Sequence, residues 1–252
     1  SDGELLVGTY GGGLSVLSAG SDSFTTYTVD PKIPTSISSN NVIAIFEDSS
    51  GDVWVGTENG LNLFDRAAGS FIVFKSTFQN PESLSSNMTW ALHEDYKGRL
   101  WIGTQSGGLN VWSPEDRRDR LNRFTQYLEN IDLPSADIYA ITSDEDGNIW
   151  MSHNRGISRF SIEDESAENF DISDGLQGTE FNHGAVFRSG SADLYFGGNN
   201  GFNIIDPKDL RKNVYLPPIQ ITEFRILNEE IVFDEPVSDN RTIELGHDFR
   251  YA

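Results

Sequence analysis

One pattern recurs along this chain at intervals of a little under fifty residues. The stretch GDVWVGTENGLNLFD at 51–65 returns almost unchanged as GRLWIGTQSGGLNVWS at 98–113. Further copies align on one large side chain that precedes a small residue. This position is occupied, at intervals of 48, 47, 49 and 45 residues, by Leu6, Trp54, Trp101, Trp150 and Tyr195. Repeats of this length are typical of propellers and solenoids, in which each unit buries an apolar face against the next.

Within each copy the apolar residues alternate with a period of two. VIAIFEDSSGDVWVGT at 42–57 and TWALHEDYKGRLWIGT at 89–104 alternate across a glycine-bearing turn, which is the pattern of a β-hairpin. A second tight turn leads to a third run such as LNLFD, and a fourth run such as SFIVFKS follows. Four short antiparallel strands per copy and no convincing helix predict an all-β chain of β-propeller blades rather than a β-sandwich.

The copies also predict the extent of each blade. Residues 3–31 supply the last three strands of a first blade, 40–76, 86–127 and 137–172 are complete, and 181–206 supply at least three strands of a fifth. Because the chain starts and stops inside repeats, we expect part of a larger, seven-bladed ring, unless about five blades close on themselves. An open blade edge would also favour self-association, for example as a homodimer.

The repeat period ends before the paired prolines Pro217 and Pro218. Two consecutive prolines suit a short, stiff linker. We therefore expect a partial β-propeller over 1–212, a linker over 213–218, and the beginning of a different β-domain over 219–252, cut short at Ala252.

Charge excludes one class of partner. The 252 residues include 39 acidic and 18 basic side chains, for a formal net charge of −21, which repels phosphate backbones and makes nucleic acid an unlikely partner. No apolar run approaches the roughly 20 residues that span a bilayer. The opening residues SDGELLVG also lack the features of a signal peptide. We expect a soluble piece, with any export signal or membrane anchor outside it.

The motif N-x-V-x-A-I-x-E-D-x-x-G-x-V-W-V-G-T-x-x-G-L at 41–61, repeated at 87–109, resembles the two-component regulator propeller repeat. Residues 173–206 resemble the last blade of that family, and PPIQITEFRILNEEI at 217–231 is similar to the opening of the immunoglobulin-like domain that follows it. Two copies depart from the motif: Ser152-His153 replaces Gly-Thr, and Ala192 lies in an altered hairpin turn.

The resemblance implies a function as well as a fold. It implies the periplasmic sensor region of a membrane-anchored bacterial two-component signalling protein. In such proteins the immunoglobulin-like domain leads to a transmembrane helix and to a cytoplasmic histidine kinase, often hybrid, or sometimes to a diguanylate cyclase. Members of the family often recognise oligosaccharides and control genes for polysaccharide use.

The sequence predicts no catalytic residue, metal site or cofactor. The acidic stretch SDEDGN at 143–148 could suggest calcium, but its glycine comes too early for an EF-hand loop and the stretch aligns with other hairpin turns. The four histidines lack metal-ligand spacing, and there is no cysteine. No motif with an activated nucleophile is present. Binding is therefore the expected function; the alternatives are a propeller lyase or hydrolase acting on polysaccharide, or a protein-binding scaffold.

The expected ligand face combines the second tight turns with the connectors between blades, which emerge at the same end of a propeller. Its side chains are rich in amides, which suit hydroxyl-bearing ligands, although asparagine is also simply a common turn residue. The repeated tryptophans are expected in the core, whereas Trp90 could equally pack or stack on a sugar. The candidate ligand-binding residues are Asn59, Trp90, Gln105, His153, Asn154, Arg155, Asn182, His183 and Asn199.

Arg155 is the one cationic side chain among the second tight turns. Its guanidinium could receive a carboxylated or sulfated sugar through two parallel hydrogen bonds. A neutral glycan bound through amides and Trp90 is equally compatible with the sequence.

Overall fold

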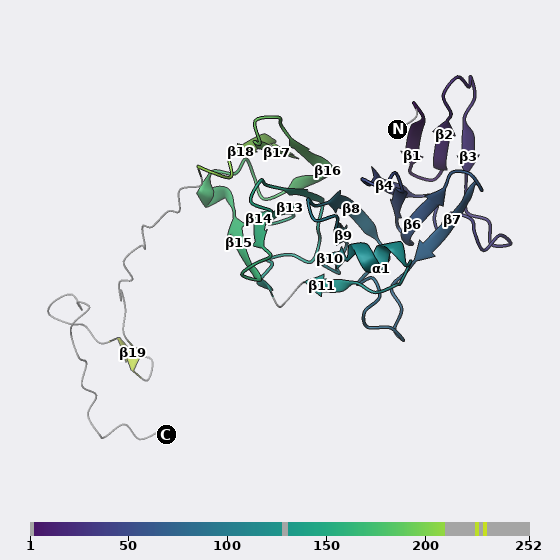
Figure 1. Cartoon of the computed structure of the whole chain (residues 1–252). Coiled ribbons are helices and arrows are strands. Elements are labelled where there is room, and N and C mark those ends of the chain that lie inside the picture. The colour runs from purple at the N-terminus through teal and green to yellow at the C-terminus, as the bar shows by residue number, and fades with distance from the viewer. Residues whose placement is uncertain (1–2, 128–130, 210–224, 227–228, 231–252) are drawn as a thin grey trace. The chain divides into compact units, whose positions relative to one another are not determined.

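The computed structural model describes residues 3–127, 131–209, 225–226 and 229–230, and Figure 1 traces the chain. Contacts divide the chain into two compact units, Ser1–Leu210 and Arg211–Ala252. The described part of the second unit is the short hairpin of β19 (Arg225–Ile226) and β20 (Glu229–Glu230). The predicted linker over 213–218 and the rest of the predicted immunoglobulin-like segment lie outside the described residues, so both stay predictions.

The described residues of the first unit form five antiparallel sheets, blades 1 to 5, and each has its strands in chain order (Figure 1). Blade 1 consists of β1 (Leu5–Thr9), β2 (Gly13–Leu17) and β3 (Thr25–Tyr27). Blades 2 to 4 consist of β4 (Val42–Glu47), β5 (Val53–Thr57), β6 (Gly60–Asp65) and β7 (Ser70–Phe74); β8 (Thr89–Glu94), β9 (Leu100–Thr104), β10 (Leu109–Trp112) and β11 (Thr125–Tyr127); and β12 (Ala140–Ser143), β13 (Ile149–His153), β14 (Gly156–Ser161) and β15 (Ser166–Phe170). Blade 5 consists of β16 (Phe181–Arg188), β17 (Leu194–Gly198) and β18 (Gly201–Ile205). The predicted propeller blades are confirmed; ring closure and self-association stay predictions.

The glycine of each second tight turn is required by backbone conformation. It lies at or just before the start of β2, β6, β10, β14 and β18, with φ between 68° at Gly108 and 126° at Gly60. Only glycine adopts this left-handed region without strain. At Gly60 a Cβ atom would also lie 2.7 Å from the carbonyl oxygen of Phe74, so the glycine lets the fourth strand approach closely.

The repeated tryptophans are fully buried in the second strands of blades 2 to 4. Each indole Nε1 donates a hydrogen bond to the aspartate six residues earlier, and that aspartate also accepts backbone N–H groups across its hairpin turn. These pairs are Asp48–Trp54 at 2.8 Å, Asp95–Trp101 at 2.8 Å and Asp144–Trp150 at 2.9 Å. The predicted core position of the tryptophans and the hairpin interpretation of SDEDGN are confirmed.

Neighbouring blades enclose these tryptophans between them. Trp101 of blade 3 lies in one buried cluster with Ile149 and Met151 of blade 4, and the other blade contacts repeat this arrangement. The glycine two places after the tryptophan allows the approach, because a Cβ on Gly103 would lie 2.7 Å from Cγ2 of Ile138. Each blade is therefore stabilised mainly by the next one.

Blade 3 contains a short helix that contradicts the all-strand prediction locally. α1 (Pro114–Arg118) lies between β10 and β11, with proline in its first turn. The Ser113 hydroxyl caps it by accepting the Asp116 N–H over 3.0 Å. A 3-10 turn, η2 (Ile172–Asp174), likewise follows blade 4 behind the capping Asp171. Elements this short show no helical periodicity in sequence, so only their capping residues could have indicated them.

The hairpin turn of blade 5 keeps the repeated shape with different residues. Ala192 takes φ 73° where blades 2 to 4 have glycines in the left-handed region. Ser189 replaces the turn aspartate, and its hydroxyl accepts the Asp193 N–H over 3.1 Å. Tyr195 stands in place of tryptophan, so no buried indole N–H needs a carboxylate here. The altered sequence of this turn thus leaves its geometry intact.

Candidate functional site

The second tight turns and the connectors between blades meet at one end of the first unit. Backbone hydrogen bonds join them from Glu58 N to Asn41 O at 3.3 Å in blade 2 and from Gln105 N to Met88 O at 3.0 Å in blade 3. A bond from Asn199 N to Glu180 O at 3.4 Å does the same in blade 5. We call this surface the connector face. The structure therefore brings together the two sets of segments that the sequence analysis combined.

Three asparagines that the sequence analysis missed hold the connectors in place. The side-chain oxygens of Asn62, Asn110 and Asn203 accept backbone N–H groups from the preceding connector over 2.9, 3.0 and 2.9 Å. Two of them are fully buried. Each stands on the third strand two residues after the turn glycine, so its repetition in the stretches Gly-Leu-Asn, Gly-Leu-Asn and Gly-Phe-Asn was the available signal.

The first strands of blades 2, 3 and 5, which are β4, β8 and β16, each contain an irregularity in their pairing. In β4 and β8 the pairing register shifts where Ile43 and Trp90 stand, and in β16 it shifts between Phe181 and Val186. Such bulges re-aim a side chain out of the regular alternation. The corresponding residue in blade 4 is Tyr139, which directly precedes β12.

Three side chains from these segments of three successive blades converge. They form an aromatic cluster of Trp90, Tyr139 and His183. The ring centroids lie 5.3 Å apart for Trp90–Tyr139, 4.4 Å for Trp90–His183 and 4.3 Å for Tyr139–His183. Trp90 and Tyr139 are half-buried, and His183 is exposed. The predicted candidates Trp90 and His183 are thus neighbours, although 93 residue positions separate them, and Tyr139 joins them.

Two carboxylates, Asp137 and Glu180, act electrostatically on this aromatic cluster. Burial raises the pKa of Tyr139, and the negative charges of Glu180 and Asp137 raise it further. Burial lowers the pKa of His183, opposed by the charge of Asp137. Asp137 also accepts the Ser106 backbone N–H over 2.8 Å, which fixes its position beside the turn of blade 3. The cluster is therefore a partly exposed apolar surface in a negative environment.

His153 is enclosed within its own turn and is not accessible to a ligand. It is fully buried, its Nδ1 accepts the Arg155 backbone N–H over 3.1 Å, and its Nε2 lies 2.8 Å from the Ser158 hydroxyl. Burial lowers the pKa of His153 to about 4, so the ring is neutral near pH 7. In blade 2 the equivalent Thr57 makes the same turn bond, to Asn59 N at 3.1 Å. Both ring nitrogens of His153 are occupied, and we leave it out of the proposed ligand contacts.

The remaining candidates line the connector face with different degrees of exposure. Asn59, Arg155, Asn182 and Asn199 are exposed, whereas Gln105 and Asn154 are half-buried. The Asn59 amide donates to the Ser38 carbonyl over 2.9 Å, which joins this turn to the preceding connector. The buried Oδ1 of Asn154 has no hydrogen-bond partner within the described part of the chain.

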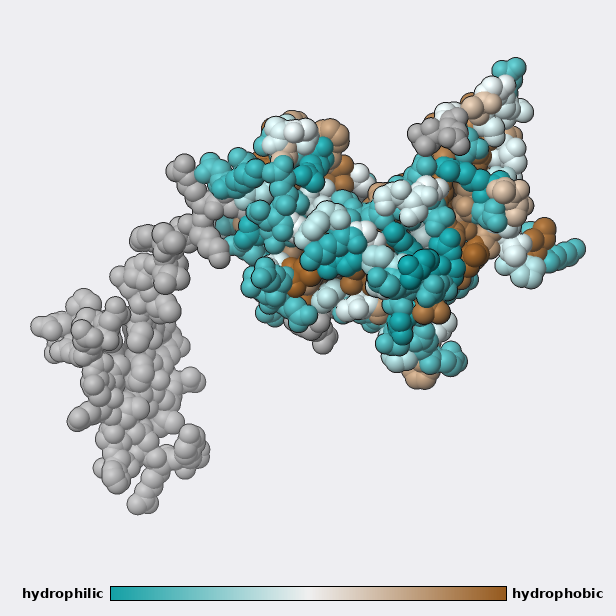
Figure 2. Space-filling view, viewed as in Figure 1, coloured by the Kyte–Doolittle hydropathy of each residue, from teal (hydrophilic) through white to brown (hydrophobic). Residues whose placement is uncertain are grey.

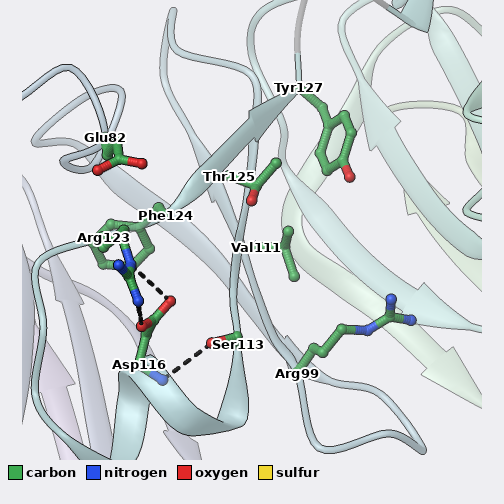
Figure 3. Close-up of a pocket in the computed structure, with 9 residues that line it drawn as sticks. All are labelled: Glu82, Arg99, Val111, Ser113, Asp116, Arg123, Phe124, Thr125 and Tyr127. Atoms are coloured by element: carbon green, nitrogen blue, oxygen red, sulfur yellow. Dashed lines mark hydrogen bonds and ion pairs between the residues drawn. The ribbon is translucent and has the colours of Figure 1, made fainter.

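Three cavities lined by described residues contain none of the aromatic-cluster side chains in their walls. One of about 440 Å³ is lined by strands β10 and β11 and by the start of α1 (Figure 3). Arg123 pairs with Asp116 on one side of it, and Arg99 and Tyr127 stand on the other. Arg99 is itself held by Asp95 at 2.7 Å. Because Arg123 is paired with Asp116 and Arg99 with Asp95, this cavity offers a weaker recognition site than the connector face.

The described residues contain no group of three or more His, Asp or Glu side chains arranged to hold a metal ion. Within the same residues, no helix has the length and apolar character needed to cross a membrane. The visible face of the first unit is predominantly hydrophilic (Figure 2), in keeping with the acidic composition.

Comparison with known proteins identifies the repeats. Residues 36–59, 83–106 and 132–155 match the two component regulator propeller family. The chain contains two-component regulator propeller repeats. Each matched segment starts in a connector and ends in the second tight turn, so the family pattern covers both parts of the connector face.

Relatives of known description agree with this family. Histidine kinase P4 of Formosa agariphila is 26% identical over 238 residues, covering 92% of this chain and 17% of the relative. The extracellular domain of BT4673 of B. thetaiotaomicron, assigned as a hybrid two component system, has a TM-score of 0.70 at 24% identity, covering 83% of this chain and 28% of that one. Virginiamycin B lyase of Staphylococcus aureus has a TM-score of 0.59 at 18% identity, covering 82% and 64%.

These matches differ in what they show. The chain spans less than a fifth of the length of the histidine kinase that it matches. The likenesses to the BT4673 domain at 24% identity and to the lyase at 18% identity show the fold alone, because fold similarity at such low identity does not carry function. The chain therefore has the fold of propeller blades, and three of its segments match the two component regulator propeller repeat.

Proposed function

We propose that this chain is the extracytoplasmic, periplasmic sensor region of a membrane-anchored two-component signalling protein, and that it binds a small-molecule ligand at the connector face. The family match, the relationship to a histidine kinase and the likeness to extracellular domains support the setting. A saccharide or related polar molecule fits the mixture of amides and aromatic rings on this face. Signal passage through an immunoglobulin-like domain to a cytoplasmic kinase belongs to the same proposal.

The observation that carries the proposal is the convergence of three aromatic side chains from three successive blades. Trp90 and Tyr139 occupy the position that Ile43 holds in blade 2, and His183 lies in the longer bulge of β16 between Phe181 and Val186. Aromatic rings at such a site provide flat surfaces for a bound molecule, and the nearby amides provide directed hydrogen bonds. We propose binding without turnover, in keeping with the role of a sensor region.

A thermal-shift screen of saccharides tests the proposal, because a ligand that binds the native state raises the melting temperature. Calorimetry on each hit then compares wild type with Trp90→Ala and with Tyr96→Ala. Tyr96 is an exposed aromatic residue in a hairpin turn at the other end of β9, which makes it a matched control. The proposal requires that only Trp90→Ala weakens binding, by about tenfold or more. Equal affinities for the three proteins, or cleavage of the ligand detected by mass spectrometry, would contradict it.

A further inference from the structure

We infer that the aromatic cluster recognises a ligand that carries a protonated amine, such as an amino sugar, in preference to an anionic ligand. This inference rests on the proposed function and narrows its ligand class. The sequence alone suggested an anionic sugar at Arg155, whereas this inference favours a cationic ligand at the aromatic cluster. The reason is the combination of ring surfaces and carboxylates at one place.

The rings supply one half of the recognition. Trp90, Tyr139 and His183 meet with centroid separations of 4.3 to 5.3 Å, and the Trp90 and His183 planes are nearly perpendicular at 84°. Two rings at a steep angle form a corner on the surface. The faces of aromatic rings carry negative partial charge and attract ammonium groups, and tryptophan does so most strongly.

The carboxylates supply the other half. Asp137 lies two residues before Tyr139, and Glu180 lies three residues before His183 in the next connector. The effect of both charges on Tyr139 shows that they lie within electrostatic range of the cluster. Arg155 is the one basic residue among the second tight turns, and its backbone N–H donates to the buried His153 of its own turn. A carboxylated or sulfated ligand would meet repulsion at the cluster, whereas an ammonium group would be attracted by rings and carboxylates together.

The fluorescence of Trp90 can be used to measure this local charge. The other four tryptophans, Trp54, Trp101, Trp112 and Trp150, have no exposed surface, so collisional quenching of tryptophan fluorescence reports on Trp90. Caesium and iodide quenching, each divided by quenching with neutral acrylamide, measure the potential around that side chain. Trp90→Phe should abolish most of the quenching and so verifies the assignment.

The charge experiment compares two double variants of equal net charge. In Asp137→Asn/Glu180→Gln we expect the ratio of caesium to iodide quenching to fall by about threefold at low ionic strength. Glu115→Gln/Glu163→Gln removes two exposed carboxylates elsewhere and should leave the ratio unchanged. An equal ratio in wild type and both variants would overturn the inference, whatever the ligand of the protein is.

The binding experiment uses three tetrasaccharide probes in calorimetry: one of glucosamine, one of N-acetylglucosamine and one of galacturonic acid. We expect the glucosamine tetramer to bind about tenfold more tightly than its N-acetylated form, and more tightly still than the acidic tetramer. Asp137→Asn/Glu180→Gln should remove this preference. Equal or reversed preference, or no binding of the glucosamine tetramer, overturns the inference of an amine. Binding of a probe that Trp90→Ala leaves unchanged instead contradicts the connector face as the ligand site.

Discussion

The two ends of each blade differ in how much the repeat allows them to vary. At the hairpin-turn end, blades 2 to 4 repeat the same aspartate, the same left-handed glycine and the same buried tryptophan, with hydrogen bonds of 2.8 to 2.9 Å. At the connector end, the same position holds Ile43, Trp90 and Tyr139 in blades 2 to 4, and His183 lies close to it in the bulge of blade 5. The first end repeats the same hydrogen bonds in blades 2 to 4, whereas the second combines repeated asparagines and glycines with these differing side chains. We therefore place the proposed ligand contacts at the second end.

The largest expected effect concerns the tryptophans. Trp101→Ala removes a fully buried indole between blades 3 and 4, and we expect a loss of about 3–5 kcal/mol in the free energy of unfolding. Trp90→Ala, at the connector end, should cost only about 1 kcal/mol. Urea denaturation followed by circular dichroism measures both. Comparable losses in the two variants would remove the distinction between the ends.

The turn aspartate should be nearly as important as the tryptophan that it binds. Asp144→Ala leaves the buried Trp150 Nε1–H and the Asn148 backbone N–H without their acceptor. We expect the variant to lose about 2–3 kcal/mol of stability, because unsatisfied buried donors are costly. Asp146→Ala, which removes an exposed carboxylate from the same turn, is the control and should have no resolvable effect. A neutral outcome for Asp144→Ala would show that the hydrogen bond contributes little.

His153 is an exception at the connector end, because it varies between blades but is buried. Its pKa of about 4 lies below its ordinary value of 6.5, so the unfolded chain takes up the proton at a higher pH than the folded chain does. The stabilisation from neutral His153 is therefore complete above pH 6.5 and is lost as the pH falls toward 4. Between pH 7 and 4.5, wild type should lose about 2 kcal/mol more stability than His153→Thr. Threonine restores the residue found in blades 2 and 3, and parallel pH profiles of the two proteins would refute this account.

The smallest effect concerns the hairpin turn of blade 5. Ala192 adopts φ 73°, in the region where a side chain is strained. Ala192→Gly should stabilise the protein by about 1 kcal/mol, because it restores the residue used in blades 2 to 4. Gly147→Ala in blade 4 is the reverse test and should be destabilising, since the added Cβ would also approach the Tyr96 ring. A stability gain from Gly147→Ala would contradict the common turn geometry.

Much of this architecture could be predicted from local sequence. Alternation with a period of two, turn glycines and a spacing near 47 residues specify blades, because these signals arise within a single repeat. The burial of Trp54, Trp101 and Trp150 also followed from their shared position. The short helix α1 could not be recognised in this way, since one turn has no detectable period. The immunoglobulin-like segment after Pro218 stays a prediction.

The choice among the candidate site residues depended on tertiary structure. The sequence indicated that Trp90, His153, Arg155 and His183 stood near turns or connectors, but not which of them were open. Tertiary structure separated them: His153 is enclosed by its own turn and by Ser158, whereas Trp90 and His183 meet Tyr139 across three blades. The period-two pattern indicates which side chains of a strand face the core of its own blade. The approach of residues from different blades depends on bulges, on the curvature between sheets and on buried asparagines, and these arise only when the repeats pack together.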